Sequence, residues 1–110
     1  MKIVVLAPRV GAELDTIRRY ATENFGAAQA ERYELAFRKV FQLIQMHETA
    51  GRARDEIGSG YRSLKVGSHV IFYYVSDVIE IVGIPHGRRS LKVYFSKGRG
   101  KRSSHRGASD

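Results

Sequence analysis

The chain has 110 residues, no cysteine, and 19 Lys and Arg against 11 Asp and Glu, which gives a formal net charge of +8. This length is enough for one domain with one hydrophobic core, and the lack of cysteine excludes a disulfide scaffold, a cysteine nucleophile and cysteine-ligated zinc. No apolar run approaches the roughly 20 residues that span a bilayer, and the apolar stretch at residues 3–7 is too short for a signal peptide, so we expect a cytoplasmic protein with no membrane partner.

The first predicted element is a strand at residues 3–7, where β-branched and apolar side chains occupy both faces, as in a strand that is covered from both sides. Pro8 ends this strand and suits the first turn of a helix. The helix is indicated by apolar residues at spacings of 4, 3, 4 and 4, namely Val10, Leu14, Ile17, Ala21 and Phe25. Gly26 is predicted to end it, because glycine readily adopts a positive φ just past a helix end.

A second helix is predicted at residues 28–46, a stretch rich in Ala, Glu, Gln and Arg and free of Gly and Pro. Its apolar face consists of Ala30, Tyr33, Phe37, Val40, Phe41 and Ile44. Because the joint between the helices is short, about four residues, they should form an antiparallel hairpin. Neither apolar face can be buried by the hairpin alone, so we expect the hairpin to pack on a sheet.

Three strands are predicted after a polar loop at residues 47–60. They cover residues 61–66, 69–75 and 78–84, with tight turns at Gly67-Ser68 and Ser76-Asp77 and with Pro85 as the end of the third strand. Residues 91–95 alternate between apolar and polar and are predicted as a short last strand. The expected fold class is therefore α+β, in the order β-α-α-β-β-β, with the helical hairpin packed on a small twisted antiparallel sheet.

Positive charge is concentrated near the C-terminus, where residues 87–110 contain eight Lys and Arg and one acid. Such a segment favours polyanionic partners, which are nucleic acid, acidic protein surfaces or anionic lipid. We therefore divide the chain into a folded domain at residues 1–96 and a basic, flexible tail at residues 97–110. The sequence leaves open whether that tail has a binding role or is simply solvated.

Several short motifs occur in a fixed order along residues 3–88. They are Leu14-x-x-Ile17-x-x-Tyr20, Glu23-Asn24-Phe25-Gly26, Gln29-Ala30 with Tyr33, Gly51-Arg52, Asp55-Glu56, Gly60-Tyr61-Arg62, the run from Gly67 to Tyr73, and His86-x-Arg88. Each motif is weak alone, but their order and spacing resemble the ParE branch of the RelE/ParE superfamily, the toxins of type II toxin–antitoxin modules. The resemblance implies the fold predicted above and a toxin that is held inactive by a cognate antitoxin protein.

The resemblance also implies a target. ParE-like toxins act on DNA gyrase and stall it on cleaved DNA, whereas their RelE-like relatives cut mRNA in the ribosome with Lys, Arg and Tyr side chains. Arg62, Arg88 and Tyr94 stand near such nuclease positions, but Val70 stands where those enzymes place an important arginine. We therefore expect a toxin that inhibits DNA gyrase by binding, without a reaction or cofactor of its own. The alternatives are a RelE-like ribosome-dependent mRNA endonuclease and an inactive relic that binds only its antitoxin or nucleic acid.

The same reasoning predicts the residues of each site. The target should bind a cationic patch at the end of the sheet, made of Arg62, His86, Arg88, Arg89 and Lys92. The antitoxin should form a hetero-oligomer with this chain through an acidic, amphipathic segment that either adds a strand at a sheet edge or covers the hairpin at Leu14, Ile17, Tyr33 and Phe37.

The four histidines do not indicate a metal site. No pair has a spacing such as i, i+4 on a helix, so no bound metal is expected. His69 lies between apolar residues of a predicted strand, and we expect its ring to be partly buried and hydrogen-bonded.

Overall fold

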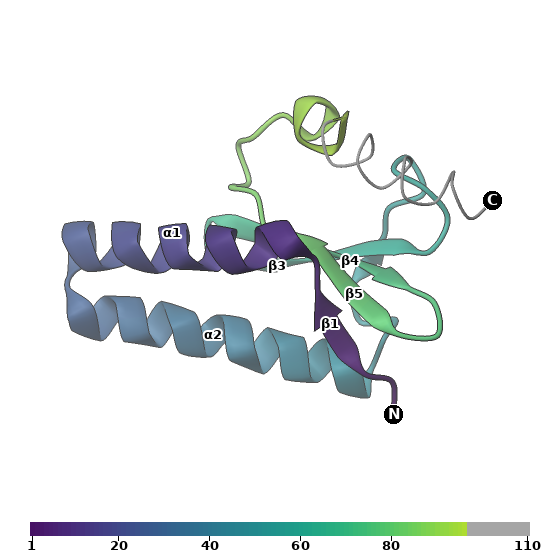
Figure 1. The fold of residues 1–110 in the computed structure, drawn as a ribbon, viewed down its shortest axis with the longest axis horizontal. Coiled ribbons are helices and arrows are strands. Elements are labelled where there is room, and N and C mark those ends of the chain that lie inside the picture. The colour runs from purple at the N-terminus through teal and green to yellow at the C-terminus, as the bar shows by residue number, and fades with distance from the viewer. Residues whose placement is uncertain (97–110) are drawn as a thin grey trace.

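The computed structural model describes residues 1–96, which form two long helices, a sheet and a short C-terminal helix (Figure 1). The elements are β1 (Val4–Leu6), α1 (Pro8–Phe25), α2 (Ala27–Met46), β2 (Arg52–Ala53), β3 (Tyr61–Val66), β4 (His69–Val75) and β5 (Ile79–Gly83), followed by a helical segment at residues 91–96. The sheet has five strands in the order β1-β5-β4-β3-β2. The basic tail predicted at residues 97–110 lies outside the described residues.

The predicted α+β fold is confirmed, with one change in the sheet. β3, β4 and β5 form the expected antiparallel meander, and Gly67 at the β3–β4 turn has a φ of +58°. β1, however, pairs with β5 in parallel, so the sheet is mixed and not antiparallel throughout. Two neighbouring parallel strands need a crossover connection between them. Here the two helices begin that connection, because they return the chain to the end of the sheet where β1 starts.

The joint between the helices is a single residue, shorter than predicted. Gly26 has φ +90° and ψ 163°, a backbone conformation that is essentially restricted to glycine. The two helices run side by side and project beyond the sheet (Figure 1). The sequence predicts Phe25 as part of the buried stripe, but it is 64% exposed because it lies at the tip of this projection, where its ring meets that of Tyr20 edge-on.

The main core lies between the hairpin and one face of the sheet, as predicted. The buried members are Val10, Phe37, Ile44, Val66, Ile71, Tyr73, Ile79, Ile81 and Ile84, and Leu14, Ile17, Tyr33, Val40 and Phe41 pack against them. Both helical stripes therefore have the predicted register. Burial of apolar side chains at about 25 cal/mol per Å² is what stabilises this arrangement.

β1 is less covered than predicted. It is an edge strand, and Val5 and Leu6 are 39% and 47% exposed. A run of apolar residues fits a fully buried strand, but here the sheet ends at β1 and the helices cover only part of it. Among residues 1–96 the outer edge of β1 pairs with no other strand.

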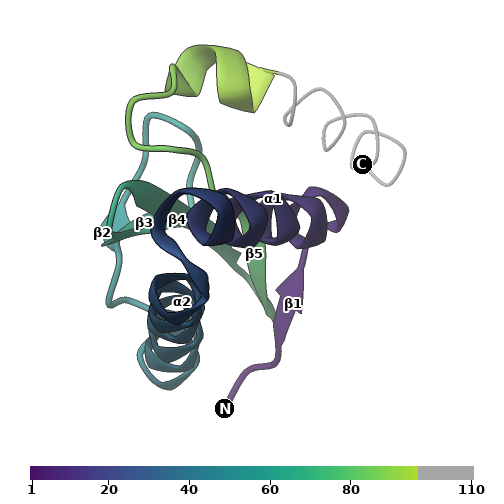
Figure 2. The same cartoon turned by 90° about the vertical axis from the view of Figure 1, so that its left-hand side faces the viewer.

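The predicted last strand at residues 91–95 is wrong, because this segment is helical and covers the second face of the sheet (Figure 2). A second core lies beneath it, made of Ile57, Phe72, Val82, Tyr94 and Phe95. Leu91, Tyr94 and Phe95 are spaced i, i+3, i+4 and so share one face of a helix. Val93, which a strand would have placed on the same side as Leu91 and Phe95, points to solvent.

Candidate functional site

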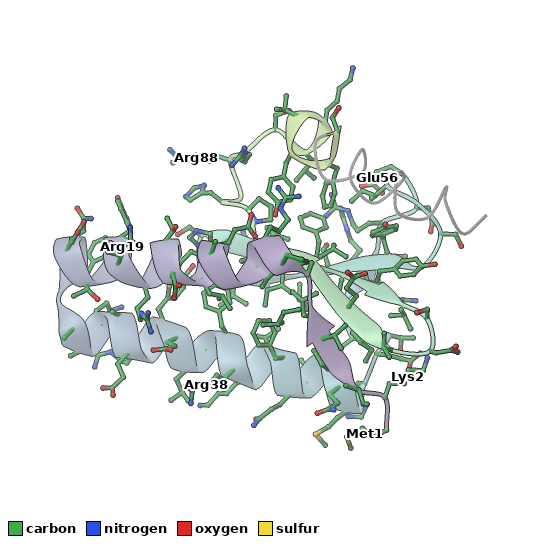
Figure 3. All side chains as sticks on the ribbon, in the orientation of Figure 1. Met1, Lys2, Arg19, Arg38, Glu56 and Arg88 are labelled. Atoms are coloured by element: carbon green, nitrogen blue, oxygen red, sulfur yellow. The ribbon has the colours of Figure 1, made fainter. Side chains whose placement is uncertain are left out.

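The cationic residues after β5 form one exposed segment, which we call the basic arm (residues 86–92). His86, Arg88, Arg89 and Lys92 are all exposed. Arg88 lies on the loop between β5 and the C-terminal helix and points away from the sheet (Figure 3). The structure thus brings together four of the five residues predicted to bind the target.

The start of the basic arm is fixed to the turn between β3 and β4. His86 forms an isolated bridge with His69, the Gly87 amide donates to the Ser68 carbonyl at 2.7 Å, and the Val70 amide donates to the Pro85 carbonyl at 3.0 Å. The arm also folds on itself, because the Arg88 amide donates to His86 Nδ1 at 3.1 Å. The backbone at the start of the arm is therefore held in place by hydrogen bonds to the sheet.

His69 is partly buried and hydrogen-bonded, as predicted. Its Nδ1 lies 2.8 Å from the Tyr33 hydroxyl, which donates to the Val66 carbonyl and accepts the Ser68 amide. Because that hydroxyl has one hydrogen and donates it to Val66, Nδ1 of His69 is the donor in this contact. Burial lowers the pKa of His69, and the neighbouring His86 lowers it further, so the ring is neutral at pH 7.

The far end of the basic arm is fixed to α1. The Tyr94 side chain is fully buried, and its hydroxyl donates to Glu13 Oε2 at 2.7 Å. The other carboxylate oxygen of Glu13 accepts the Ile84 amide at 2.8 Å. The Arg9 guanidinium lies 3.9 Å from the centroid of the Tyr94 ring. Burial and the adjacent carboxylate raise the pKa of Tyr94, so this hydroxyl stays protonated.

Arg62 does not belong to the same patch. On β4 it pairs with Tyr73, which in turn pairs with Ile81 on β5. His86 instead pairs with His69, which pairs with Val66 on β3. The strand positions of Arg62 and Val66 differ by four residues, or roughly 13 Å. The Arg62 guanidinium donates to the carbonyls of Gly51 at 2.7 Å and Thr49 at 3.3 Å and so holds the loop before β2. The prediction that it lies beside Arg88 is therefore wrong.

The three residues considered for a nuclease are likewise not brought together. Arg62 shares the helix-covered face of the sheet with Tyr73, while Tyr94 packs in the second core on the opposite face. Tyr94 is 0% exposed, so its hydroxyl is not accessible to a substrate. Arg88 alone of the three is exposed as a reacting group would need to be.

The residues predicted to bind the antitoxin lie mainly inside the fold. Phe37 is 2% exposed and packs against Tyr33 with ring centroids 5.0 Å apart, so an outside partner cannot reach it. Leu14, Ile17 and Tyr33 are partly buried against the same core. The side chains that make good core residues are therefore poor candidates for a docking surface, and contact through the accessible parts of these three stays a prediction.

A different set of apolar side chains is exposed, and sequence reasoning missed it. The set comprises Met1, Ile3, Val5 and Leu6 around β1, and Leu35, Leu43 and Met46 on α2. The start of the chain lies beside the end of α2, because Gln45 donates to the Lys2 carbonyl at 2.9 Å and Lys2 pairs with Glu48 at 3.0 Å (Figure 3). The sequence did contain a sign of this exposed set, because Leu35, Leu43 and Met46 are apolar residues that lie outside the predicted apolar face of the second helix.

Within residues 1–96, no group of three or more His, Asp and Glu side chains is arranged to hold a metal ion, and no helix is both long and apolar enough to cross a membrane. Lys92 borders a shallow groove between the C-terminal helix and the loop before β3, with Ile57, Leu91 and Phe95 as its apolar lining.

Comparisons with known proteins agree with this fold. The family model described as "ParE toxin of type II toxin-antitoxin system, parDE" matches residues 4–91. A protein named Toxin ParE1 from Caulobacter vibrioides is 34% identical over 95 residues, which cover 86% of this chain and 99% of that protein. Toxin ParE1 from Mycobacterium tuberculosis is 35% identical over 89 residues, or 79% of this chain and 91% of that protein.

A solved structure shows the same fold at lower sequence identity. It is described as the chromosomal ParDE TA system from P. aeruginosa, and it is similar with a TM-score of 0.67 at 19% identity, over 78% of this chain and 96% of that chain. The family match covers both helices, the whole sheet and most of the basic arm. The chain therefore belongs to the ParE toxin family and is the toxin component of a type II toxin–antitoxin system.

Proposed function

We propose that this toxin inhibits DNA gyrase by binding, that it does so through the basic arm, and that residues 1–96 are sufficient as the toxin domain. The observation that carries the proposal is the arm itself: three cationic side chains and His86 are exposed on a backbone that is hydrogen-bonded at its start and anchored at its end. A fixed cationic surface attracts an enzyme that holds DNA, because opposite charge speeds the encounter and orients it.

The buried Tyr94 supports binding over mRNA cleavage. A nuclease that uses a tyrosine to move a proton needs a hydroxyl that substrate can reach and a pKa near or below its usual range. Tyr94 is inaccessible, its pKa is raised, and its proton is already donated to Glu13. Its position indicates a structural role, and the position of Arg62 on the opposite face supports the same view.

Loss of the two arginines of the basic arm should weaken gyrase inhibition by a limited factor. Arg88→Ala combined with Arg89→Ala removes two exposed charge contacts, and we expect the concentration needed to trap gyrase on cleaved plasmid to rise roughly 10- to 100-fold. The matched control is Arg19→Ala with Lys39→Ala, which removes the same charge from exposed positions on α1 and α2 and should leave trapping nearly unchanged.

The opposite result is equally specific. In a reconstituted translation reaction the purified toxin should leave ribosome-bound mRNA intact. If the wild-type toxin makes codon-specific mRNA cuts and Tyr94→Phe does not, the proposed gyrase inhibition is wrong and the protein is a RelE-like nuclease. A chain that neither traps gyrase nor cuts mRNA, yet binds its antitoxin, would be the inactive relic.

Membership of the ParE family implies an antitoxin partner. We infer that the antitoxin covers the exposed apolar surface formed by β1 and the outer side of α2, and that the complex forms in the cytoplasm. Val4 and Leu6 turn their backbone polar groups away from β5, because Ile3 and Ala7 bond to β5 and alternate residues of a strand point their polar groups to the same side. An acidic, amphipathic segment that adds a strand there would place its apolar side chains on Ile3 and Met46.

A charge placed in this apolar surface should weaken antitoxin binding. Met46→Asp is expected to raise the dissociation constant roughly tenfold or more, because a side chain buried in the complex loses its apolar contact. Gln29→Asp is the control, since it adds the same charge to an exposed position at the opposite end of α2. Binding can be measured by calorimetry at two salt concentrations. Equal effects of both variants, or a complex that dissociates at moderate salt, would contradict an apolar contact surface.

A further inference from the structure

Glu13 joins three elements that are far apart in the sequence. It lies on α1, and its two carboxylate oxygens accept the Ile84 amide at the end of β5 and the Tyr94 hydroxyl on the C-terminal helix, at 2.8 and 2.7 Å. Arg9, one turn earlier on α1, lies 3.6 Å from the same carboxylate and stacks over the Tyr94 ring. We call Arg9, Glu13 and Tyr94 the Glu13 clasp.

The place of the clasp follows from the way the sheet ends. β1 stops at Leu6, which is level with Ile81, so β5 continues past its strand partner. Pro85 bonds to β4 through its carbonyl, and the Ile84 amide therefore points to the side that β1 has left. A buried amide without an acceptor costs roughly 1–3 kcal/mol. Glu13 supplies that acceptor in place of a strand.

The clasp also fixes the position of the C-terminal end of the basic arm. The C-terminal helix has six described residues, too few to be stable alone in water, so its position depends on what its side chains contact. Tyr94 and Phe95 pack on the second core, and the Tyr94 hydroxyl makes a hydrogen bond to a charged group, which is the stronger kind. Arg89 lies over the same ring, at 5.3 Å from its centroid.

We propose that Glu13 is a positioning residue for target binding: by holding Tyr94 and Ile84 it presents Arg88, Arg89 and Lys92 in one fixed arrangement. This rests on the proposed gyrase contact through the basic arm. An arm that is fixed before binding does not lose its conformational freedom at the interface, and affinity rises accordingly. Glu13 itself does not touch the target, because it is partly buried beneath the arm.

The first measurement is hydrogen exchange in the free toxin. In Glu13→Ala, peptides that cover residues 84–96 should exchange about tenfold faster or more, while residues 71–75 of β4, which do not bond to the arm, keep their protection. Glu13→Gln retains a carbonyl acceptor for Ile84 and an amide that can donate to the Tyr94 oxygen, so it should restore most of the protection. Glu23→Ala, an exposed acid on the same helix, is the charge-matched control and should resemble the wild type.

The second measurement is gyrase trapping, read as a double-mutant cycle. Glu13→Ala should weaken trapping about tenfold, and Glu13→Gln about threefold or less. In the background of Arg88→Ala with Arg89→Ala, Glu13→Ala should add little, because it acts through those arginines. Purely additive effects, or a loosened arm with unchanged trapping, would overturn the positioning role.

The two proposals fail in different ways. If the wild-type toxin does not trap gyrase, the proposed function is wrong, whatever the exchange data show. If it does trap gyrase but the exchange of residues 84–96 is the same in Glu13→Ala as in the wild type, the clasp does not hold the arm. Faster exchange at residues 71–75 of β4 as well would mean general destabilisation and would also overturn the proposal.

Discussion

Truncating Phe37 to alanine is expected to lower the free energy of unfolding by about 3–5 kcal/mol, as removal of a buried aromatic ring does. Phe37 is 2% exposed, and its ring packs edge-on against Tyr33 and His69. It lies where α2 meets the sheet, so the cavity cannot be filled by a small movement of one side chain. Since small domains are stable by only about 5–15 kcal/mol, this single change should leave the toxin marginally folded.

Urea denaturation followed by circular dichroism measures this effect. Leu35→Ala is the control, because Leu35 lies on the outer side of the same helix and is 49% exposed; it should cost less than about 1 kcal/mol. If both variants unfold at the same urea concentration as the wild type, the helix does not pack in the register described here.

Replacing Gly83 by alanine is expected to displace Tyr94 from its site. A Cβ at this position would lie 2.8 Å from Cζ of Tyr94 and inside the contact distance of its hydroxyl. Overpacking of this kind costs about 1–3 kcal/mol, and loss of the hydrogen bond to the Glu13 carboxylate adds up to about 3 kcal/mol. The C-terminal helix should then leave the second face of the sheet.

A double-mutant cycle in thermal or urea unfolding tests this directly. In the Tyr94→Ala background the space beside Gly83 is empty, so Gly83→Ala should cost less than about 1 kcal/mol. Binding of an apolar dye to the uncovered Phe72 and Val82 should increase in Gly83→Ala alone. Equal costs of Gly83→Ala in both backgrounds would mean that the two residues do not share the site.

Much of the fold could be predicted because its elements have clear periods. The stripes of both helices repeat near 3.6 residues, and the meander strands are separated by glycine-containing or polar turns. The segment after residue 90 was ambiguous, because Leu91, Val93 and Phe95 fit a strand as well as Leu91, Tyr94 and Phe95 fit a helix. The helix is favoured because Phe72 and Val82 lie on the face of the sheet that α1 and α2 leave uncovered, and Tyr94 and Phe95 of the helix cover them.

The candidate site was predictable only in part. Charge alone identified the basic arm, since a cluster of Arg and Lys after the last strand is visible in the sequence. Only the placement of Arg62 beside Arg88 was wrong, because the level of each residue along the strands depends on the pairing, which the sequence does not state. Glu13 had no signal at all, because its partner Tyr94 is 81 residues away and one acid on an amphipathic helix resembles any other.

The parallel pairing of β1 with β5 has a consequence for how the toxin is made. The first strand finds its neighbour only when residues 79–81 have been synthesised, and α1 acquires its contact with Tyr94 later still. Contacts between such distant parts of a chain are also the slow ones to form. A chain that stops before residue 79 therefore lacks both the neighbour of its first strand and the partner of Glu13, so neither the closed sheet nor the anchored arm can form.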